Sequence, residues 1–270
     1  MYLYVLNFTV TSSDETPQIM NENVKEISVH VPKHKKPDNQ EDFGHYLAGL
    51  IDGDGWFSNN TANLVLHELD YSLAYYVKKR IGYGIVSKLK TKNSIFYSIK
   101  KREGLLKFLT FINGKLRTQE KCNYIQKHLL EVDEDSFGLN DNFTINSVDN
   151  LNNYWLAGFI DSCGSFQLET EEYPQPKGDT LMKVRLVLKL SHKTPSVFDA
   201  IKSRLGGNIT HDKETDTYYF ATSTFESAKK VVEYINKYHI LSSKYVDYVK
   251  WRKSYILVQN DFNVILSIDE

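Results

Sequence analysis

The sequence is poor in the residues that mark several classes of protein. Its 270 residues include only two cysteines, six prolines and 14 glycines, and no run of 18 uninterrupted apolar residues. Two cysteines exclude a disulfide scaffold and a four-thiolate zinc site, and they suggest a reducing compartment. The low proline and glycine contents exclude collagen-like and wholly disordered chains, and the lack of a long apolar run excludes a membrane-spanning helix. The length suits one large domain or two of ordinary size.

The net charge of −1 conceals an uneven distribution of charge. Residues 43–131 hold 14 basic and 7 acidic side chains, residues 153–260 hold 15 and 12, and residues 132–152 hold five acids with no lysine or arginine. Two basic blocks joined by an acidic connector suit an anionic ligand contacted by two modules, although chance clustering on solvated faces would give the same pattern. Only six of the 33 basic residues are arginines, which favours contacts to phosphates over arginine–guanine pairs.

One segment of the chain occurs twice. Residues 46–57 read YLAGLIDGDGWF and residues 155–166 read WLAGFIDSCGSF, so that LAG-x-ID-x-x-G is common to both. Further along, both copies continue with an apolar-periodic helix that ends at a glycine, and later with a lysine nine residues after an isoleucine. The chain is therefore expected to consist of one module used twice.

Each half predicts the same order of elements: a helix ending in the repeated motif, two strands, a helix, two strands, and one or two closing helices. The second half has about 15 additional residues in its first hairpin, where proline and glycine mark the turn. We expect an α+β fold divided into an N-terminal tail, a first half, an acidic linker, a second half and a C-terminal tail, at residues 1–41, 42–131, 132–152, 153–256 and 257–270. The N-terminal tail is expected to dock on the body, because so short a segment rarely forms its own core.

Basic residues alternate along one expected strand in each half. Alternation places each set on a single face of its strand, and a two-stranded ribbon fits the major groove of DNA. The candidate nucleic-acid-binding residues are Lys88, Lys90, Lys92, Lys183, Arg185 and Lys189. An ordinary solvated sheet face would show the same alternation.

The repeated motif contains small residues, Ala48 and Gly49 in the first copy and Ala157 and Gly158 in the second. Small residues let two helices cross closely, so the two copies are expected to pack against each other with their C-terminal ends together. Asp54 lies at that end of the first copy.

The motifs LAGLIDGDG and LAGFIDSCG resemble the paired signatures of the LAGLIDADG homing endonuclease and group I intron maturase family, in its single-chain, two-repeat form. The resemblance covers about residues 43–256. It implies two pseudo-symmetric αββαββα halves packed through the LAGLIDADG helices, saddle-shaped antiparallel sheets over DNA, and a monomer with an internal pseudo-two-fold axis. Members of this family cut both strands of a long target with Mg2+, or assist the splicing of the group I intron that encodes them.

The resemblance also implies roles for individual residues. Asp54 would ligate Mg2+ between the scissile phosphates, while Gly49, Asp52, Gly158 and Asp161 would be structural. The position that matches Asp54 is occupied by Cys163, and a neutral thiol is a poor ligand for Mg2+. Half of the paired metal site is therefore expected to be missing.

The repeated lysines, Lys121 and Lys244, resemble basic residues that line the family's active sites. They would orient the attacking water or balance developing charge, or would simply contact phosphate. His67 and His192 would point at the nucleic acid or be merely packed or solvated.

These features predict an intron-encoded, RNA- and DNA-binding protein whose main function is that of a group I intron splicing maturase, with its endonuclease lost or weakened at Cys163. The alternatives are an active Mg2+-dependent double-strand endonuclease or nickase, and a DNA-binding protein without catalysis. The expected partners are intron RNA, double-stranded DNA and a helper splicing protein, and no association with a membrane is expected. The N-terminus does not resemble an arginine-rich transit peptide, which fits a protein encoded and made in the mitochondrion.

Overall fold

The structure, a computed structural model, describes residues 26–58, 60–89, 93–130, 143–146, 150–174 and 180–260, without the side chains of residues 171–183. Most of the predicted linker and parts of both predicted tails therefore lie outside the described residues.

The first half follows the predicted order of elements. Its helices and strands are α1 (Gln40–Asp54), β1 (Gly55–Ser58), β2 (Thr61–His67), α2 (Tyr71–Ile81), β3 (Ile85–Lys88), β4 (Ser94–Ile99), α3 (Arg102–Ile112) and α4 (Gln119–Ile125). A 3-10 turn, η1 (Glu68–Asp70), precedes α2, and a π-helical turn, η2 (Gln126–Leu130), continues α4. The side chain of Asn39 caps the start of α1 by accepting a hydrogen bond from the Asp42 amide, and the chain turns into β1 at Gly55.

The second half repeats this order with a longer first hairpin. Its elements are α5 (Trp155–Cys163), β5 (Gly164–Pro174), β6 (Thr180–His192), the 3-10 turn η3 (Pro195–Phe198), α6 (Asp199–Leu205), β7 (Asn208–Asp212), β8 (Thr217–Ala221), α7 (Phe225–Lys237) and α8 (Lys244–Asn260). Helix α8 continues beyond residue 256, where the second half was expected to end. Val258 on this last turn is buried, and Gln259 bonds to the backbone of Ile27.

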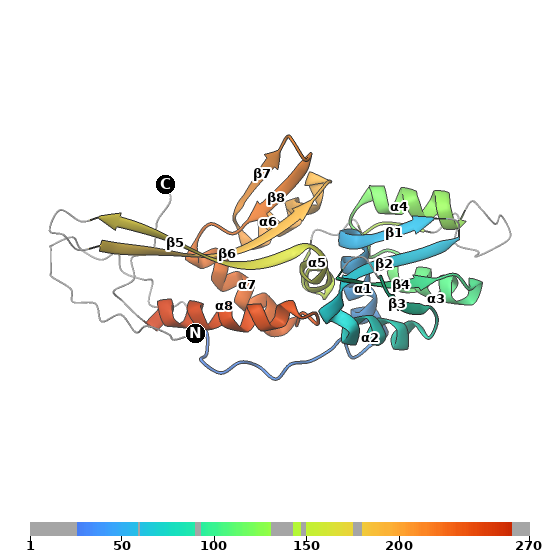
Figure 1. Cartoon of the computed structure of the whole chain (residues 1–270), viewed down its shortest axis with the longest axis horizontal. Coiled ribbons are helices and arrows are strands. Elements are labelled where there is room, and N and C mark those ends of the chain that lie inside the picture. Colours follow the sequence, from blue (N-terminus) through green and yellow to red (C-terminus); the bar gives the residue numbers. More distant parts are fainter. Residues whose placement is uncertain are drawn as a thin grey trace.

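Each half forms one four-stranded antiparallel sheet. The strand orders are β1-β2-β4-β3 and β5-β6-β8-β7, so the two sheets share one topology. The predicted α+β fold with two αββαββα halves is confirmed. Figure 1 shows α1 and α5 at the centre of an elongated molecule, with the two sheets extending to opposite sides. Within the described residues, none of the helices has the length and apolarity that a membrane crossing requires.

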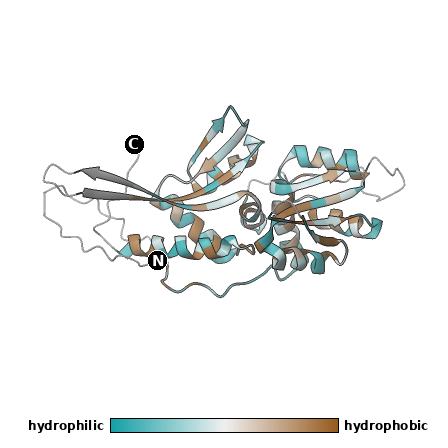
Figure 2. Ribbon diagram, in the orientation of Figure 1, coloured by the Kyte–Doolittle hydropathy of each residue, from teal (hydrophilic) through white to brown (hydrophobic). Residues whose placement is uncertain are grey.

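One face of each sheet packs on helices and forms the core. Leu64 and Ile95 in the first sheet and Leu188 and Phe220 in the second are at most 1% exposed. In Figure 2 the hydrophobic residues gather on the strands and on the sides of the helices that meet them. The alternation of strand side chains leaves the other face of each sheet to polar, aromatic or charged residues.

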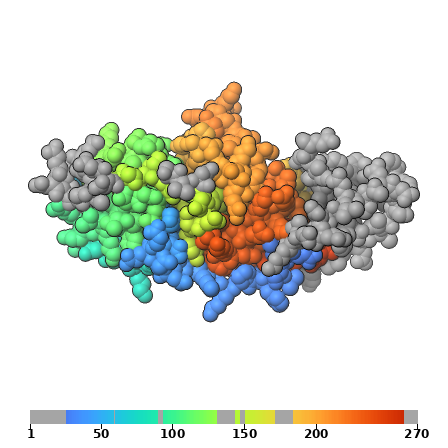
Figure 3. All heavy atoms as spheres, turned by 180° about the vertical axis from the view of Figure 1, so that it is seen from behind, coloured from blue at the N-terminus to red at the C-terminus, as the bar shows by residue number. Residues whose placement is uncertain are grey.

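The N-terminal segment 26–39 is an extended strap that contacts both halves. At its start, Arg252 of α8 donates a hydrogen bond to the carbonyl of Ser28 at 2.6 Å. At its end, Arg80 of α2 donates to the carbonyls of Pro37 and Asn39, both at 2.7 Å. Figure 3 shows the strap in blue along the lower surface, from α8 toward the first half. The described part of the predicted N-terminal tail is therefore docked, as expected.

Candidate functional site: a cleft where the two LAGLIDADG helices end

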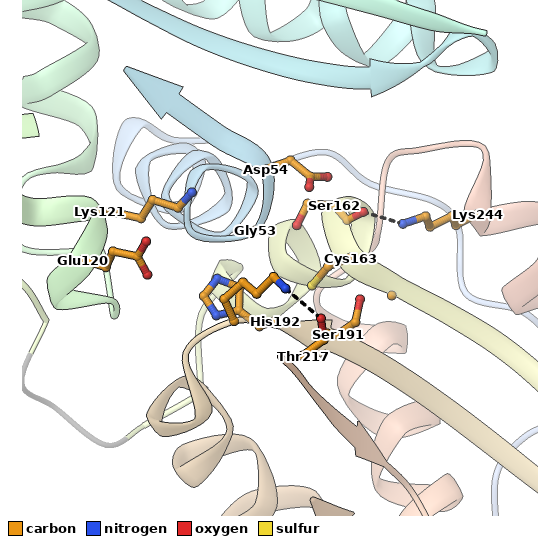
Figure 4. A pocket seen from close by; sticks show the side chains of 12 residues that line it. Gly53, Asp54, Glu120, Lys121, Ser162, Cys163, Ser191, His192, Thr217 and Lys244 are labelled. Atoms are coloured by element: carbon orange, nitrogen blue, oxygen red, sulfur yellow. Dashed lines mark hydrogen bonds between the residues drawn. The ribbon is translucent and has the colours of Figure 1, made fainter. Parts of the chain in front are cut away.

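The C-terminal ends of α1 and α5 meet at a cleft of about 470 Å³. The approach is close, since a Cβ placed on Gly53 would lie 1.8 Å from the hydroxyl oxygen of Ser162. Figure 4 shows Asp54 and Cys163 at neighbouring helix ends, with Lys121 and Lys244 to either side. The cleft is lined by Gly53, Asp54, Glu120, Lys121, Ser162, Cys163, Gly164, Ser191, His192, Lys193, Thr217 and Lys244. The structure thus brings together the predicted catalytic residues of both halves.

Asp54 is the last residue of α1 and lies in this cleft. Partial removal from water raises the pKa of its carboxyl above the usual value, and the positive charges of Lys244 and Lys121 oppose that rise. A carboxylate at a helix C-terminus is unfavourable in the field of the helix dipole, and the neighbouring lysines favour its ionised form.

Each of the two lysines donates to a carbonyl near the end of one LAGLIDADG helix, although the carbonyls are not at equivalent positions of the repeat. Lys121 Nζ donates to the carbonyl of Gly55 at 2.6 Å, and Lys244 Nζ donates to the carbonyl of Ser162 at 2.8 Å. Burial lowers the pKa of Lys121, while the carboxylates of Asp52, Glu120 and Asp54 act in the opposite direction. Each cation therefore offsets the partial negative charge at a helix end, with Asp54 between them.

Cys163 is the counterpart of Asp54 at the end of α5, but its chemistry differs. Its thiol donates a hydrogen bond to the carbonyl of Phe159 at 3.1 Å. Burial, reinforced by the negative charge of Asp54, raises the pKa of the thiol to about 12. The side chain is therefore neutral near pH 7 and presents a protonated sulfur where the first half presents a carboxylate.

Asp52 and Asp161 lie inside the fold and accept equivalent sets of hydrogen bonds. Asp52 accepts from the amide of Arg117 at 2.8 Å, from the amide and hydroxyl of Thr118, and from the Trp155 indole at 2.7 Å. These donors belong to the start of α4 and to the start of α5.

Asp161 accepts from the amide of Leu241 at 2.6 Å, from the amide and hydroxyl of Ser242, and from the hydroxyl of Tyr46 at 2.6 Å. Burial raises the pKa of both aspartates, Asp52 and Asp161, and the hydrogen-bond donors oppose it. Each aspartate joins its own helix to the lysine-bearing helix of its half and to an aromatic residue of the opposite half. This arrangement supports the structural role expected for both.

Gly49 and Gly158 lie where α1 and α5 cross. A Cβ on Gly49 would lie 2.0 Å from the carbonyl oxygen of Trp155, and one on Gly158 would lie 2.0 Å from that of Tyr46. No side chain fits at either position without separating the helices. The close crossing inferred from the small residues of the motif is therefore present.

The expected basic ribbons differ between the halves. Arg185 and Lys189 lie on the face of β6 that points away from the helices; Lys189 Nζ is 4.5 Å from the ring centroid of Tyr219. Lys88 does not lie on such a face: it is paired across the sheet with Ile95, which is fully buried, and its Nζ binds Glu68 at 2.7 Å. The prediction for Lys88 is corrected because β3 has the opposite phase from the one assumed. Lys90, Lys92 and the side chain of Lys183 lie outside the described residues.

His192 and His67 have different environments. His192 lines the cleft, where its Nε2 donates to the Asp52 carbonyl at 3.0 Å and its Nδ1 accepts from the Thr194 amide at 3.0 Å. His67 is exposed and caps η1 by accepting from the Leu69 amide.

Sequence reasoning missed Glu120 in the cleft, where it accepts a hydrogen bond from the Thr194 hydroxyl at 3.0 Å. Its position directly before Lys121 was the available signal.

The donor set of the cleft fits one hard cation better than two. Mg2+ is commonly held by one or two carboxylates with phosphates and waters completing the shell. Asp54 supplies a carboxylate at the helix ends, while the other carboxylate of the cleft, Glu120, accepts a hydrogen bond from Thr194. The protonated sulfur of Cys163 does not suit this ion. Among the residues that the structure describes, no group of three or more His, Cys, Asp or Glu side chains is placed to hold a metal ion.

Comparisons with known proteins agree with this geometry. A family described as LAGLIDADG endonuclease matches residues 156–255. A Schizosaccharomyces pombe protein named "Uncharacterized cox1 intron-2 37.2 kDa protein" is 46% identical over 239 residues, which cover 88% of this chain and 72% of that protein. The chain belongs to the LAGLIDADG family.

More distant relatives carry different functional names. The Saccharomyces cerevisiae "Intron-encoded DNA endonuclease aI3" is 26% identical over 83% of this chain, which spans 65% of the relative. The Saccharomyces cerevisiae "Intron-encoded RNA maturase bI4" is 25% identical over 66% of this chain, which spans 26% of the relative. The solved structure of the LAGLIDADG meganuclease I-AabMI bound to uncleaved DNA has a TM-score of 0.65 at 17% identity, covering 82% of this chain and 93% of that one. That likeness shows the fold.

Proposed function

We propose that this chain is an intron-encoded protein that binds double-stranded DNA through its two sheets and acts as a splicing maturase for a group I intron, with DNA cleavage lost or weakened. The observation that carries the proposal is Cys163, which presents a protonated thiol at the position symmetric to Asp54. Relatives named for DNA cleavage and for RNA maturation both support this range of functions.

The chemistry of the cleft explains why cleavage would be weak. Mg2+ bound at Asp54 would supply Lewis-acid stabilisation of charge on the scissile phosphate. Lys121 and Lys244 would bind phosphate oxygens, or orient a water molecule, from either side of Asp54. Cys163 offers no equivalent negative charge, and the loss of a catalytic ligand costs on the order of several kcal/mol, where each 1.36 kcal/mol is tenfold in rate.

A strand-biased nickase is the second candidate, and the surroundings of Asp54 favour it. Asp54, Glu120, two lysines and His192 lie together in the cleft, which is enough to assemble one cleavage centre at the end of α1. This protein would cut one strand of its target efficiently and the other slowly. An endonuclease that cuts both strands would need a replacement for the missing carboxylate.

A plasmid assay distinguishes these functions. Supercoiled DNA carrying the intronless exon junction is incubated with protein and Mg2+, and nicked and linear products are followed separately. The proposed maturase gives little linear product, whereas a nickase gives nicked circles that disappear in Asp54→Asn. Rapid linearisation that depends on Asp54 would contradict the proposal.

Splicing is measured with the same variants. Protein-dependent splicing of the host intron in vitro, retained in Asp54→Asn, is the expected result. Absence of any effect on splicing, in the presence or absence of a helper protein, would exclude the maturase function.

We further propose that the protein functions in the mitochondrion as a monomer. The relative named for a cox1 intron supports an organellar origin, and the single chain already holds both halves of the pseudo-symmetric site.

A further inference from the structure

The outward faces of the two sheets differ in chemistry. Strand pairing places Trp56 opposite Asn63, Asn63 opposite Ser98, and Val65 opposite Phe96 on one face of the first sheet, with Ile85 beside them opposite Ser98. Within the described part of β1 to β4, this face carries no lysine, arginine, aspartate or glutamate.

The corresponding face of the second sheet is charged. Glu169 is paired with Arg185, and Lys189 lies two positions beyond Val187 on the same face. Lys189 and Tyr219 are in contact. The two faces therefore cannot recognise the same groups.

The first face exposes apolar side chains to the outside. Trp56 is 43% exposed and Ile85 is 68% exposed, and they lie in the two edge strands of the sheet, β1 and β3. The rings of Trp56 and Phe96 lie 5.8 Å apart and form one aromatic surface. Trp56 follows Gly55, whose carbonyl binds Lys121, so this surface begins at the cleft. A duplex seated on the cleft would lie directly on it.

The major groove offers one apolar group, the C5-methyl of thymine, and distinguishes the other bases by hydrogen-bond donors and acceptors. A face without charged side chains cannot make the bidentate arginine or lysine contact to guanine. We infer that the first sheet recognises a thymine-rich half-site by contacts of Trp56, Val65, Ile85 and Phe96 with thymine methyl groups. This inference rests on the proposed binding of double-stranded DNA.

The lengths of the strands add a second asymmetry. The longest strand of the first sheet has seven residues and that of the second has 13. At a rise of about 3.4 Å per residue, these strands extend about 24 and about 44 Å. The thymine-rich half-site is therefore the shorter of the two.

Selection from a randomised duplex library tests the inference. Bound duplexes are recovered in buffer with EDTA, which prevents cleavage, and are sequenced. We expect one short arm enriched in thymine and a longer arm with mixed bases. The thymines of the short arm are then replaced by deoxyuridine, which removes only the methyl group. Each replacement of a contacted thymine by deoxyuridine should weaken binding about fourfold, which corresponds to the loss of one buried methyl carbon.

Variants assign the effect to the first sheet. Trp56→Ala and, as an independent test at a more exposed position, Ile85→Ser should each reduce the sensitivity to deoxyuridine. Leu257→Ser is the matched control, because Leu257 is 58% exposed on α8 and lies on neither sheet. Deoxyuridine in the long arm should change binding less than twofold.

The outcomes separate this inference from the function on which it rests. Sequence-specific binding without thymine enrichment, or without an effect of deoxyuridine in the short arm, would overturn the inference alone. A failure to select any duplex would overturn the proposed DNA binding and the inference with it.

Discussion

Asp52 and Asp161 accept hydrogen bonds from the same kinds of donor in the two halves, whereas Asp54 and Cys163, two residues further along, share neither charge nor proton affinity. The first pair is buried, and a buried carboxylate is tolerated only when its oxygens are hydrogen-bonded. The second pair faces a cleft. The fold therefore requires the first pair to remain equivalent in both halves, while it leaves the second pair free to differ.

The crossing of α1 and α5 is the feature whose loss would have the largest effect on both halves. Gly158→Leu places a side chain against the carbonyl of Tyr46, and we expect no cooperatively folded protein. Circular dichroism and urea denaturation measure this outcome.

Gly114→Ala is the control for the crossing, because Gly114 has a φ of 70° but an added Cβ would meet only the Thr144 hydroxyl oxygen, at an ordinary contact distance of 3.8 Å. That variant should lose only about 1 kcal/mol of unfolding free energy. Equal losses in both variants would contradict the close crossing.

The thiol of Cys163 tests the difference in the cleft. Because its pKa is about 12, the thiolate fraction of Cys163 rises tenfold for each pH unit below that value and is still very small at pH 8. In the Cys122→Ala variant, we expect alkylation of the native protein to be about a thousandfold slower than that of the same chain in urea, where the pKa is near 8.5. Mass spectrometry gives both rates. Rapid alkylation in the native state would show that Cys163 is ionised and available as a charged group.

The two buried aspartates test the equivalence of the halves. Asp52→Asn and Asp161→Asn each replace one accepting carboxylate oxygen by an NH2 group that faces hydrogen-bond donors, and each should cost about 2 to 3 kcal/mol of unfolding free energy. Urea denaturation at pH 7 checks whether the two losses agree. A large loss for one variant with none for the other would show that the two aspartates are not equivalent in stabilising their halves.

Cys163→Asp should make the two halves of the cleft more alike. A second carboxylate beside Asp54 is expected to increase cutting of the second strand about tenfold, a gain of about 1.4 kcal/mol in transition-state stabilisation. The ratio of linear to nicked plasmid reports this change, and Cys163→Ser is the control of similar size without charge. An unchanged ratio would mean that residue 163 does not lie at a metal position.

The smallest expected effect concerns the salt dependence of DNA binding, which should differ between lysines on β6 and β3. Lys189→Ala should lower the slope of log binding constant against log salt concentration by about one, as expected for the loss of one phosphate contact. Lys88→Ala should leave that slope unchanged, because Lys88 is paired with Glu68 on the other side of its sheet. The same change in both variants would contradict this assignment of faces.

Much of the fold could be predicted from the sequence because the same order of elements is indicated independently by both copies of the repeat. The motif with its small residues fixed the central helices, and glycines such as Gly82 marked the ends of others. The phase of β3 was not predictable from its lysines, since in a four-residue strand the pairing with the buried Ile95, a partner distant in sequence, decides which side faces the core.

The site could be predicted only in part. Asp54 and Cys163 follow from the motif, and Lys121 and Lys244 from the repeat. The position of His192 in the cleft and one of the four donors around each buried aspartate depend on contacts between the halves, which spacing along one chain does not report. The lack of charge on the first sheet became visible only when strand pairing assigned each residue to a face.

The strap of residues 26–39 has a consequence for target geometry. It is bound to α8 of one half by Arg252 and to α2 of the other by Arg80. The two halves are therefore connected at two places, the strap and the crossing of α1 and α5. A single connection would permit a hinge motion between the halves, whereas two separate connections resist it. For the proposed binding of DNA through both sheets, the number of base pairs between the two half-sites is then set by the protein, and we expect targets with one base pair inserted at the centre to bind through only one half.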